Sequence, residues 1–341
     1  VFNFHYSLLS TESNTNPSYL QDVGVLYFYG KVVKKDYLMA KKFLELAFKQ
    51  NKRYGSYLLG KMYFEGLGVE KSYLIAKEYL EISASFNDSD ALDNLGLIYQ
   101  YGFGVERDYL KAENYFKLAI SNEYDMAYIH LGLLYENVNK ARECYIESTS
   151  RGLVNGYFNL GNLYAEGLGV KQDYKKAREF YEKSAKCNNK DSLFQLGRFY
   201  QYGYGVDKNI NKALKYYLEA ANLDDPNAYI NLGLIYFNGH EIESKDIKRA
   251  MHYYEKALEL NCSFGAYFLA EIYEKGIDVK KDLKKAFQLY KLASKKSNSF
   301  ALIKLGDFYE RGFIVEQDYI KALQYFELAA KQNNSFAFVR I

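Results

Sequence analysis

Apolar and polar residues follow one another with a helical period in this chain, and the pattern itself recurs. Its most regular element is a Leu-Gly-x-x-Tyr core, whose glycines are 36 residues apart except for one interval of 29 and one of 37. We call this position the repeat glycine; it is occupied by Gly24, Gly60, Gly96, Gly132, Gly161, Gly197, Gly233, Ala270 and Gly306. A period of this length predicts nine stacked repeats in an all-α protein.

The first part of each repeat predicts a helix that packs closely on its neighbours. A small residue five positions before the repeat glycine forms an i, i+4, i+7, i+8 stripe with the Leu, a following apolar residue and the Tyr. These small residues are Gly55, Ala91, Ala127, Gly156, Ser192, Ala228, Gly265, Ala301 and Ala337. Six positions after the repeat glycine, Gly66, Gly102 and Gly203 are typical of helix C-termini.

The second part of each repeat predicts a helix that begins at a side-chain cap. An Asp, Ser or Asn stands four positions before a helical Ala, and its oxygen can accept a hydrogen bond from the first turn. The caps are Asp36, Ser72, Asp108, Asp173, Asn209, Asp246, Asp282 and Asp318. Three positions after the Ala comes an aromatic residue or Leu, from Phe43 to Tyr325, which we expect in the core. Most of the 37 tyrosines are therefore predicted to be packing residues.

The fourth repeat lacks seven residues between Gly132 and Ala141, all from the loop between its helices. Asn137 still stands four positions before Ala141, so the cap is kept and the loop is interpreted as a spacer. The predicted domains are a candidate degenerate cap at 1–16, nine repeats at 17–334 with the short fourth repeat around 125–153, and the start of a truncated tenth repeat at 335–341.

The unit A-x-x-x-L-G-x-x-Y-x-x-G-x-G-V-x-x-D-Y-x-x-A resembles the Sel1-like repeat, a relative of the tetratricopeptide class. Its best copies run from Asp90 to Ala119 and from Gly156 to Ala185. The resemblance implies a right-handed α-solenoid superhelix whose first helices line a concave face, and an adaptor or scaffold role without catalytic residues. Bacterial members often act in the cell envelope or in host contact, and eukaryotic members assist protein quality control. Ala270, Ile210 and His240-Glu241 depart from the family pattern.

A partner-binding surface is predicted on the face of the first helices that the repeat stack leaves open. Two positions before the repeat glycine stand side chains that can donate and accept hydrogen bonds, which suits the backbone of an extended peptide. These are Asn94, His130, Asn159, Gln195 and Asn231, with Phe158, Phe194 and Arg198 beside them. A plain solvated polar face explains the same residues equally well, and the similarity to tetratricopeptide grooves favours binding.

Two further surfaces are candidates. Glu271, Glu274, Lys275, Asp307, Glu310 and Arg311 are expected on the C-terminal first helices, where mixed charge can set the register of a partner. Tyr57, Phe64 and Tyr101 are a candidate aromatic patch near the N-terminal end. For the charged set, a solvated face is the favoured interpretation.

Composition narrows the function classes. The net charge is +3 and no basic stripe is interleaved with aromatics, so nucleic acid is not an expected partner. No run of about 18 apolar residues is present, so no membrane-spanning segment is expected. The three cysteines are far apart, the four histidines lack partners at metal or triad spacing, and the Gly-x-Gly loops follow helices rather than strands. We therefore expect no catalytic, metal or cofactor site.

The expected function is that of a non-enzymatic scaffold or adaptor that binds a protein or peptide. An immunity or inhibitor protein that neutralises a toxin or effector enzyme is the first alternative. A structural scaffold of the cell envelope is the second, with self-association through Phe336 and Phe338 of the last repeat. The chain begins at Val1, so the compartment stays open: cytoplasmic, or exported to the periplasm if a leader has been removed.

Overall fold

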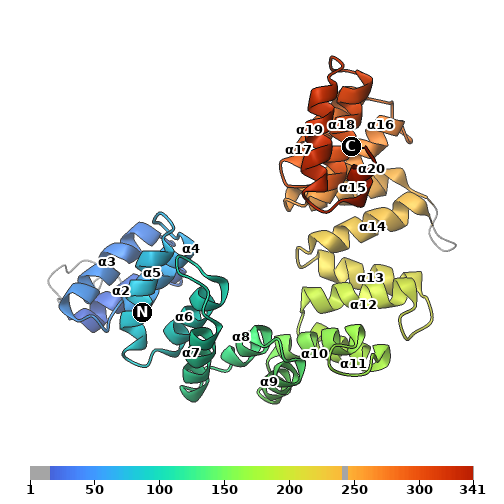
Figure 1. Ribbon diagram of the computed structural model, residues 1–341. Coiled ribbons are helices and arrows are strands. Elements are labelled where there is room, and N and C mark those ends of the chain that lie inside the picture. Colours follow the sequence, from blue (N-terminus) through green and yellow to red (C-terminus); the bar gives the residue numbers. More distant parts are fainter. Residues whose placement is uncertain (1–15, 240–244, 341) are drawn as a thin grey trace. The chain divides into compact units, whose positions relative to one another are not determined.

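The computed structural model describes residues 16–239 and 245–340, and within them every regular element is an α-helix (Figure 1). The predicted cap at 1–16 lies outside these residues except for Asn16, and so does the His240-Glu241 departure. The chain divides into an N-terminal part, residues 1–160, and a C-terminal part, residues 161–341, each of which is described by itself.

In the N-terminal part the helices are α2 (Pro17–Tyr29), α3 (Tyr37–Gln50), α4 (Ser56–Glu65), α5 (Tyr73–Ala84), α6 (Ser89–Tyr101), α7 (Tyr109–Ser121), α8 (Ala127–Leu134) and α9 (Val138–Ser150). Helix α10 (Val154–Glu166) contains the boundary. The C-terminal part has α11 (Tyr174–Ala185), α12 (Lys190–Tyr202), α13 (Ile210–Ala221), α14 (Pro226–Asn238), α15 (Ile247–Glu259), α16 (Ser263–Lys275), α17 (Leu283–Ser294), α18 (Ser299–Arg311), α19 (Tyr319–Ala330) and α20 (Ser335–Arg340). Helices α2 to α19 pair into nine hairpins, which confirms the predicted all-α repeat fold.

The second helices begin where the caps were predicted. Asp108 is extended at the N-terminus of α7, and its carboxylate accepts a hydrogen bond from the Lys111 backbone N–H at 2.9 Å. Asn137 does the same for the short repeat, accepting from the N–H groups of Asn139 and Lys140. First helices end as expected too: Gly203 follows α12 in the left-handed region, with φ of 79°, and its N–H donates to the Phe199 carbonyl.

The repeat glycine is required because a large side chain of the second helix packs directly on it. A Cβ atom added at Gly197 would lie 2.5 Å from Cε1 of Tyr217, a side chain with no exposed surface. Phe116 lies on Gly96 in the same way, and Leu44 on Gly24. The ring or branched chain therefore takes most of the space that a side chain at this position would need, and in the eighth repeat the methyl group of Ala270 is the side chain that stands there.

The core residue of the second helix lies four positions after the Ala, so the prediction of three positions is wrong by one. Leu44, Leu80, Phe116, Tyr145, Tyr181, Tyr217, Tyr254, Tyr290 and Phe326 are the buried set. The preceding residue instead stacks on the Tyr of the first helix, as Tyr216 does on Tyr200 with ring centroids 5.7 Å apart. Lys212, one helical turn before Tyr216 in α13, also lies over the Tyr200 ring, with its Nζ 4.9 Å from the ring centroid.

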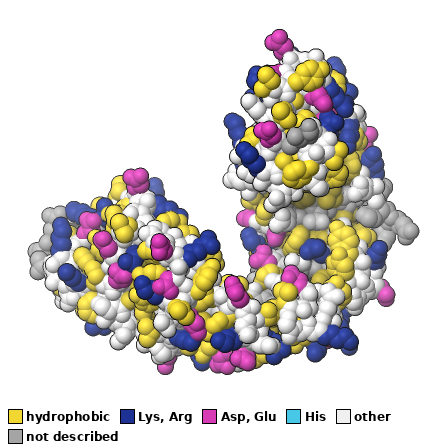
Figure 2. All heavy atoms as spheres, viewed as in Figure 1, with side chains coloured by type: hydrophobic (Ala, Val, Ile, Leu, Met, Phe, Trp, Pro, Cys, Tyr) yellow, Lys and Arg dark blue, Asp and Glu magenta, His cyan; other side chains and the backbone are white. Residues whose placement is uncertain are grey.

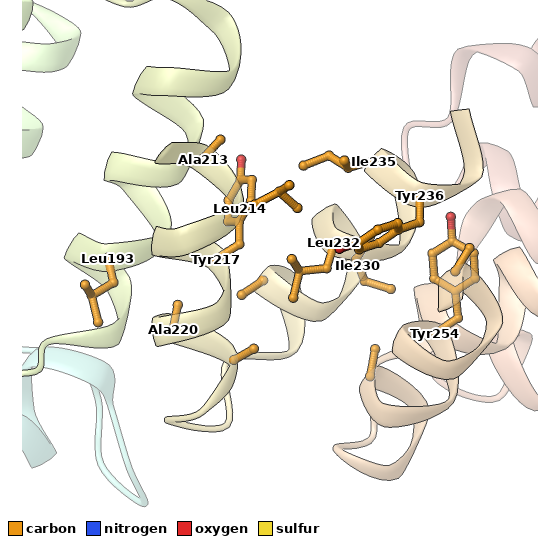
Figure 3. Packing of buried hydrophobic residues seen from close by; sticks show 14 of the residues in the cluster. Leu193, Ala213, Leu214, Tyr217, Ala220, Ile230, Leu232, Ile235, Tyr236 and Tyr254 are labelled. Atoms are coloured by element: carbon orange, nitrogen blue, oxygen red, sulfur yellow. The ribbon is translucent and has the colours of Figure 1, made fainter. Parts of the chain in front are cut away.

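Apolar clusters extend from one hairpin to the next within each part. In the C-terminal part, Leu193, Tyr217, Leu232 and Tyr254 belong to a single cluster that runs through three repeats (Figure 3). The small residues five positions before the repeat glycine are all buried. At Gly265 a Cβ atom would lie 2.5 Å from the carbonyl oxygen of Tyr254, in the preceding hairpin. The predicted close approach of neighbouring helices is thereby confirmed.

The loop between the helices also covers the hairpin before it. Tyr204 stacks on Tyr174, at the start of the preceding second helix, with ring centroids 5.3 Å apart. In the short fourth repeat no such loop exists, and the equivalent Tyr109 is 53% exposed, beside Leu110 at 75%. The gap is a groove of about 580 Å³ that Leu133 and Tyr135 also line. The loop is thus more than a spacer, because its loss uncovers apolar surface.

Candidate partner-binding surfaces

The predicted row of polar side chains belongs to both parts of the chain, and its N-terminal members are partly engaged within the protein. Asn94 is half-buried, and its Nδ2 donates to the carbonyl oxygen of Asp90 in its own helix at 2.8 Å. His130 places Nδ1 2.7 Å from a carboxylate oxygen of Asp93. Asn159 and Phe158 are half-buried in α10. The first helices therefore present these residues at their surface, with one polar group of Asn94 and of His130 already paired.

The C-terminal members of the polar row also form hydrogen bonds within the protein. Asn231 Nδ2 donates to the carbonyl oxygen of Asn227 at 2.9 Å, one turn earlier in α14. Gln195 accepts a hydrogen bond from Arg198 at 3.2 Å, so these two predicted residues are brought together. Phe194 is half-buried against Tyr217, with ring centroids 5.8 Å apart.

Asp93 is a residue that the sequence reasoning missed. It is only 3% exposed, and a carboxylate at that depth needs a partner, which His130 of the next repeat provides. The two residues stand three and two positions before their repeat glycines, 37 residues apart. Comparison of adjacent repeats at these positions, rather than a search along one helix, would have found the pair.

A groove of the N-terminal part lies over α2, α4 and α6 and the loops that precede α4 and α6, and we call it the Asp90 groove. It has a volume of about 750 Å³ and is lined by Tyr29, Tyr57, Phe86 and Asp90, among others. The Tyr57 hydroxyl lies 3.5 Å from the Asp90 carboxylate, and Tyr124 hydrogen-bonds the same carboxyl. Burial raises the pKa of Asp90, and the negative charge of Asp88 raises it further.

The predicted aromatic patch near this end is not a single surface. Tyr57 lines the Asp90 groove, whereas Phe64 and Tyr101 lie around Phe103, with ring centroids 5.8 and 5.5 Å from it. Phe103, in the loop between α6 and α7, therefore contacts Phe64 and Tyr101 at the C-terminal ends of α4 and α6. Tyr57 stands at the opposite, N-terminal end of α4.

In the C-terminal part a second groove of about 520 Å³ lies over α16, α18 and α20, and we call it the C-terminal groove. Phe300, Ile303, Phe336 and Val339 line it, and their chemistry is mostly apolar. Its charges are paired within the chain: Lys304 contacts Glu274 at 3.0 Å, and Arg340 contacts both Asp307 and Glu310. Lys275 likewise pairs with Glu271 at 3.2 Å. Of the predicted charged residues, Glu271 and Lys275 therefore pair with each other, whereas Glu274, Asp307 and Glu310 pair with Lys304 and Arg340, which were not predicted, and Arg311 lies over the Phe313 ring.

Buried tyrosines of the second helices donate hydrogen bonds from their hydroxyls to side chains of the first helices. Tyr217 donates to Gln201 at 2.6 Å, and Tyr290 donates to Glu274 at 2.6 Å, each acceptor standing four positions after the repeat position. In two other repeats one member of this pair is present without the other. Gln100 has the acceptor, but the ring on Gly96 is that of Phe116, and the buried Gln100 Oε1 has no hydrogen-bond partner among the described residues. Tyr254, labelled in Figure 3, has the hydroxyl, but Phe237 occupies the acceptor position four residues after Gly233, and the hydroxyl has no hydrogen-bond partner among the described residues.

The described residues hold no group of three His, Cys, Asp or Glu that could bind a metal ion. None of the described helices is both long and apolar enough to cross a membrane. On the face seen in Figure 2, Lys and Arg side chains are interspersed with Asp and Glu. What these surfaces can do is bind another molecule through hydrogen bonds, aromatic contacts and single charges.

Tandem helical hairpins with grooves over their first helices define a helical-repeat binding protein. The Sel1 repeat family matches the chain in nine segments, at residues 19–52, 54–85, 89–124, 123–153, 154–189, 190–225, 226–262, 263–298 and 299–334. The chain therefore belongs to the Sel1 repeat family, which confirms the resemblance seen in the sequence. Sel1 repeats generally mediate protein–protein interactions, and the fold is typically a non-enzymatic scaffold.

Solved structures share this fold. A protective antigen of uropathogenic Escherichia coli with an SLR fold is 27% identical, with a TM-score of 0.59 over 97% of this chain and 72% of that one. A Sel1 repeat protein from Oxalobacter formigenes is 24% identical, with a TM-score of 0.63 over 96% of this chain and 93% of that one. An immunity protein from Pseudomonas aeruginosa reaches a TM-score of only 0.46 at 18% identity, over 62% of this chain and 83% of that one, which carries no functional argument. No curated protein matches the chain.

Proposed function

We propose that this chain is a non-enzymatic adaptor that binds a protein or peptide partner along the open face of its first helices. The observation that supports the proposal most strongly is the position of two grooves. The Asp90 groove and the C-terminal groove both lie over first helices, in different parts of the chain. Part of each lining is exposed apolar surface, which Tyr29 and Phe86 provide in the first groove and Phe300, Phe336 and Val339 in the second.

The polar row adds a way to bind a peptide backbone. Asn94 and Asn231 each use one amide hydrogen within their own helix, which fixes the side-chain orientation while leaving the amide oxygen as an acceptor. Pre-oriented groups lose less conformational entropy on binding than mobile ones. Phe158 and Phe194 add half-buried apolar surface next to this row. An extended segment with unpaired N–H groups is the ligand that such acceptors fit.

The test is alanine replacement of Asn94, Asn159, Gln195 and Asn231, alone and with Phe158 and Phe194. Partners are first captured on the intact protein and identified by mass spectrometry, and affinity is then measured by calorimetry. We expect weaker binding at an unchanged melting temperature. Lys215→Ala and Glu78→Ala, on exposed positions of second helices, are the matched controls.

Unchanged affinity in all of these groove variants would contradict the proposal and direct attention to the second helices or the loops. The stoichiometry of the complex separates the alternatives. A tight one-to-one complex with a single enzyme, which the chain inhibits, would favour an immunity function. A concentration-dependent rise in mass that Phe336→Ser abolishes would favour a structural scaffold.

A further inference from the structure

The Asp90 groove contains a carboxylate without a cation. Asp90 is half-buried, and in the described residues it forms no ion pair; its hydrogen-bond donors are the neutral hydroxyls of Tyr57 and Tyr124. Asp93 contacts His130, whereas Asp88 also lines the groove and accepts a hydrogen bond from the Ala91 N–H at the start of α6, so it adds negative charge beside Asp90. A negative charge in a partly desolvated site is unfavourable unless a positive charge compensates it.

The cations of the surrounding region do not supply that charge. Arg53 also lines the groove, but it is exposed and makes no ion pair in the part of the chain that the structure describes. Lys61 lowers the pKa of Asp90, but by less than burial and Asp88 raise it, and the ion-pair partner of Lys61 is Glu65 at 3.9 Å. The C-terminal groove differs in this respect, because its acidic side chains have basic partners within 4 Å.

The walls of the groove suit the rest of a basic side chain. Tyr29 and Phe86 line it and are each 45% exposed, so both rings are accessible to a ligand. Aromatic faces attract ammonium and guanidinium groups, and they also cover the methylene stem of Lys or Arg. Ser83 lies at the base of the groove and is 3% exposed, which leaves the aromatic rings and Asp90 as the groups that a ligand meets first.

We propose that the Asp90 groove binds a lysine or arginine side chain of the partner, with the cation beside the Asp90 carboxylate and the stem against Tyr29 and Phe86. This inference rests on the proposed function, because it assigns one subsite of the same first-helix face. Charge complementarity selects the ligand: the groove offers the Asp90 and Asp88 carboxylates, neither of which forms an ion pair among the described residues, and four aromatic rings, so a cation on an apolar stem fits it. An acidic or uncharged side chain would leave Asp90 unpaired.

The probe is a pair of short acetylated and amidated peptides with a central Lys or Arg, compared with the same peptides carrying norleucine or citrulline. Binding is measured by calorimetry on the full chain at low and at high salt. We expect the basic peptides to bind at least about tenfold more tightly, with the difference reduced by salt. Equal affinity for basic and neutral peptides would overturn the inference.

Asp90→Asn is the central variant, since the amide keeps the acceptor for Tyr57 and removes the charge. We expect it to lose the preference for basic peptides. Asp191→Asn is the matched control, because Asp191 occupies the same register position in α12, is exposed, and should leave binding unchanged. Phe86→Ala, at an exposed position, should weaken basic peptides more than neutral ones.

The Arg53→Gln variant shows whether the groove prefers a positively or a negatively charged ligand. If the groove recognises cations, this variant binds basic peptides as well as the wild type does or better. If it instead binds anions through Arg53, the variant loses affinity for a peptide with a central Glu, and the inference is wrong. A partner that responds to the Gln195 and Asn231 variants but not to Asp90→Asn would refute the cation subsite alone and leave the adaptor function standing.

The stability of Asp90→Asn gives an independent check. The raised pKa means that folding favours the protonated carboxyl, so the favourable contribution exists at low pH and is lost as pH rises through the folded-state pKa. At neutral pH the ionised Asp90 opposes folding, and Asp90→Asn should therefore melt at the same temperature or higher. A melting temperature that falls at neutral pH would mean that Asp90 already has a compensating charge, and would count against the proposed ligand.

Discussion

Replacing Phe116 with Tyr is expected to stabilise the N-terminal part, because it supplies the hydrogen-bond donor that Gln100 lacks. In the C-terminal part the equivalent pair is complete, with Tyr217 donating to Gln201 at 2.6 Å. Phe116 lies on Gly96 as Tyr217 lies on Gly197: in both repeats an added Cβ atom would be 2.6 Å from the ring Cδ1. The hydroxyl of the new tyrosine is therefore directed to the same place below the first helix.

The size of the expected stabilisation follows from the burial of the Gln100 side chain. Gln100 is 8% exposed, and its buried Oε1 has no hydrogen-bond partner among the described residues. A net gain of about 0.5–1.5 kcal/mol is typical of one buried hydrogen bond. The added oxygen atom needs little new space, because the Tyr217 repeat accommodates the same ring in the same fold. We expect the gain for Phe116→Tyr to fall within that range.

The assay must resolve single repeats, because stability in a repeat array is distributed among neighbouring hairpins. Native-state hydrogen exchange of the amides in α6 and α7 reports on the affected hairpin, with α18 and α19 as an internal reference. Thermal unfolding of the whole chain gives the net change. We expect slower exchange in α6 and α7, no change in α18 and α19, and a higher melting temperature.

The matched cycle adds Gln100→Leu. In that background the new hydroxyl has no acceptor, so Phe116→Tyr should cost about 1–3 kcal/mol instead of stabilising. Tyr217→Phe is the reverse experiment, and it should destabilise the C-terminal part by leaving Gln201 unpaired. If Phe116→Tyr destabilises in both backgrounds, or if Tyr217→Phe has no effect, the hydrogen-bond reasoning is refuted.

Three other perturbations have expected outcomes. Gly197→Ala should lower the stability by about 1–3 kcal/mol, because its Cβ atom would lie 2.5 Å from Cε1 of Tyr217; a wild-type melting temperature would contradict the packing argument. Asp173→Ala should cost about 1 kcal/mol by removing the acceptor for the Lys176 N–H, whereas Asp173→Asn should cost less, as thermal unfolding would show. At neutral pH a thiol reagent should modify the exposed Cys187 well before Cys144, since burial raises the pKa of Cys144 to about 11; equal rates by mass spectrometry would be inconsistent with that burial.

Capping and spacing made the fold predictable from the sequence. Asp108 and Asn137 mark helix starts by themselves, because a side-chain oxygen before a helical stripe has few other uses. The core ring was misplaced by one position because two apolar residues stand side by side there, as Tyr216 and Tyr217 do. A helical period cannot choose between neighbours, and only the contact with the repeat glycine shows that Tyr217 points inward.

The candidate surfaces were less predictable than the fold. The sequence places Asn94 and Gln195 on the open face, but it gives no sign that Asn94 bonds its own helix or that Gln195 meets Arg198. The Asp90 groove was not predicted, since Tyr57 and Asp90 come from different repeats and meet only when the hairpins stack. Contacts between repeats depend on the rotation from one hairpin to the next, which sequence periodicity does not contain.

The short fourth repeat shows which exposed surfaces are explained by the packing of the hairpins and which are not. The exposure of Tyr109 has a sufficient cause in the missing loop, because Tyr174, at the same position of α11, is covered by Tyr204 of the loop after α12. Leu110 is exposed for another reason, since Leu38 and Leu74 are 69% and 58% exposed although their loops are present. Apolar exposure at that groove therefore needs no ligand to explain it. The half-buried carboxylate of Asp90 is different. No missing loop accounts for its lack of an ion pair among the described residues, and burial raises its pKa although it stands in the first turn of α6, where a negative charge is favourable. We therefore regard the Asp90 groove, rather than the one beside the short repeat, as the stronger candidate for binding.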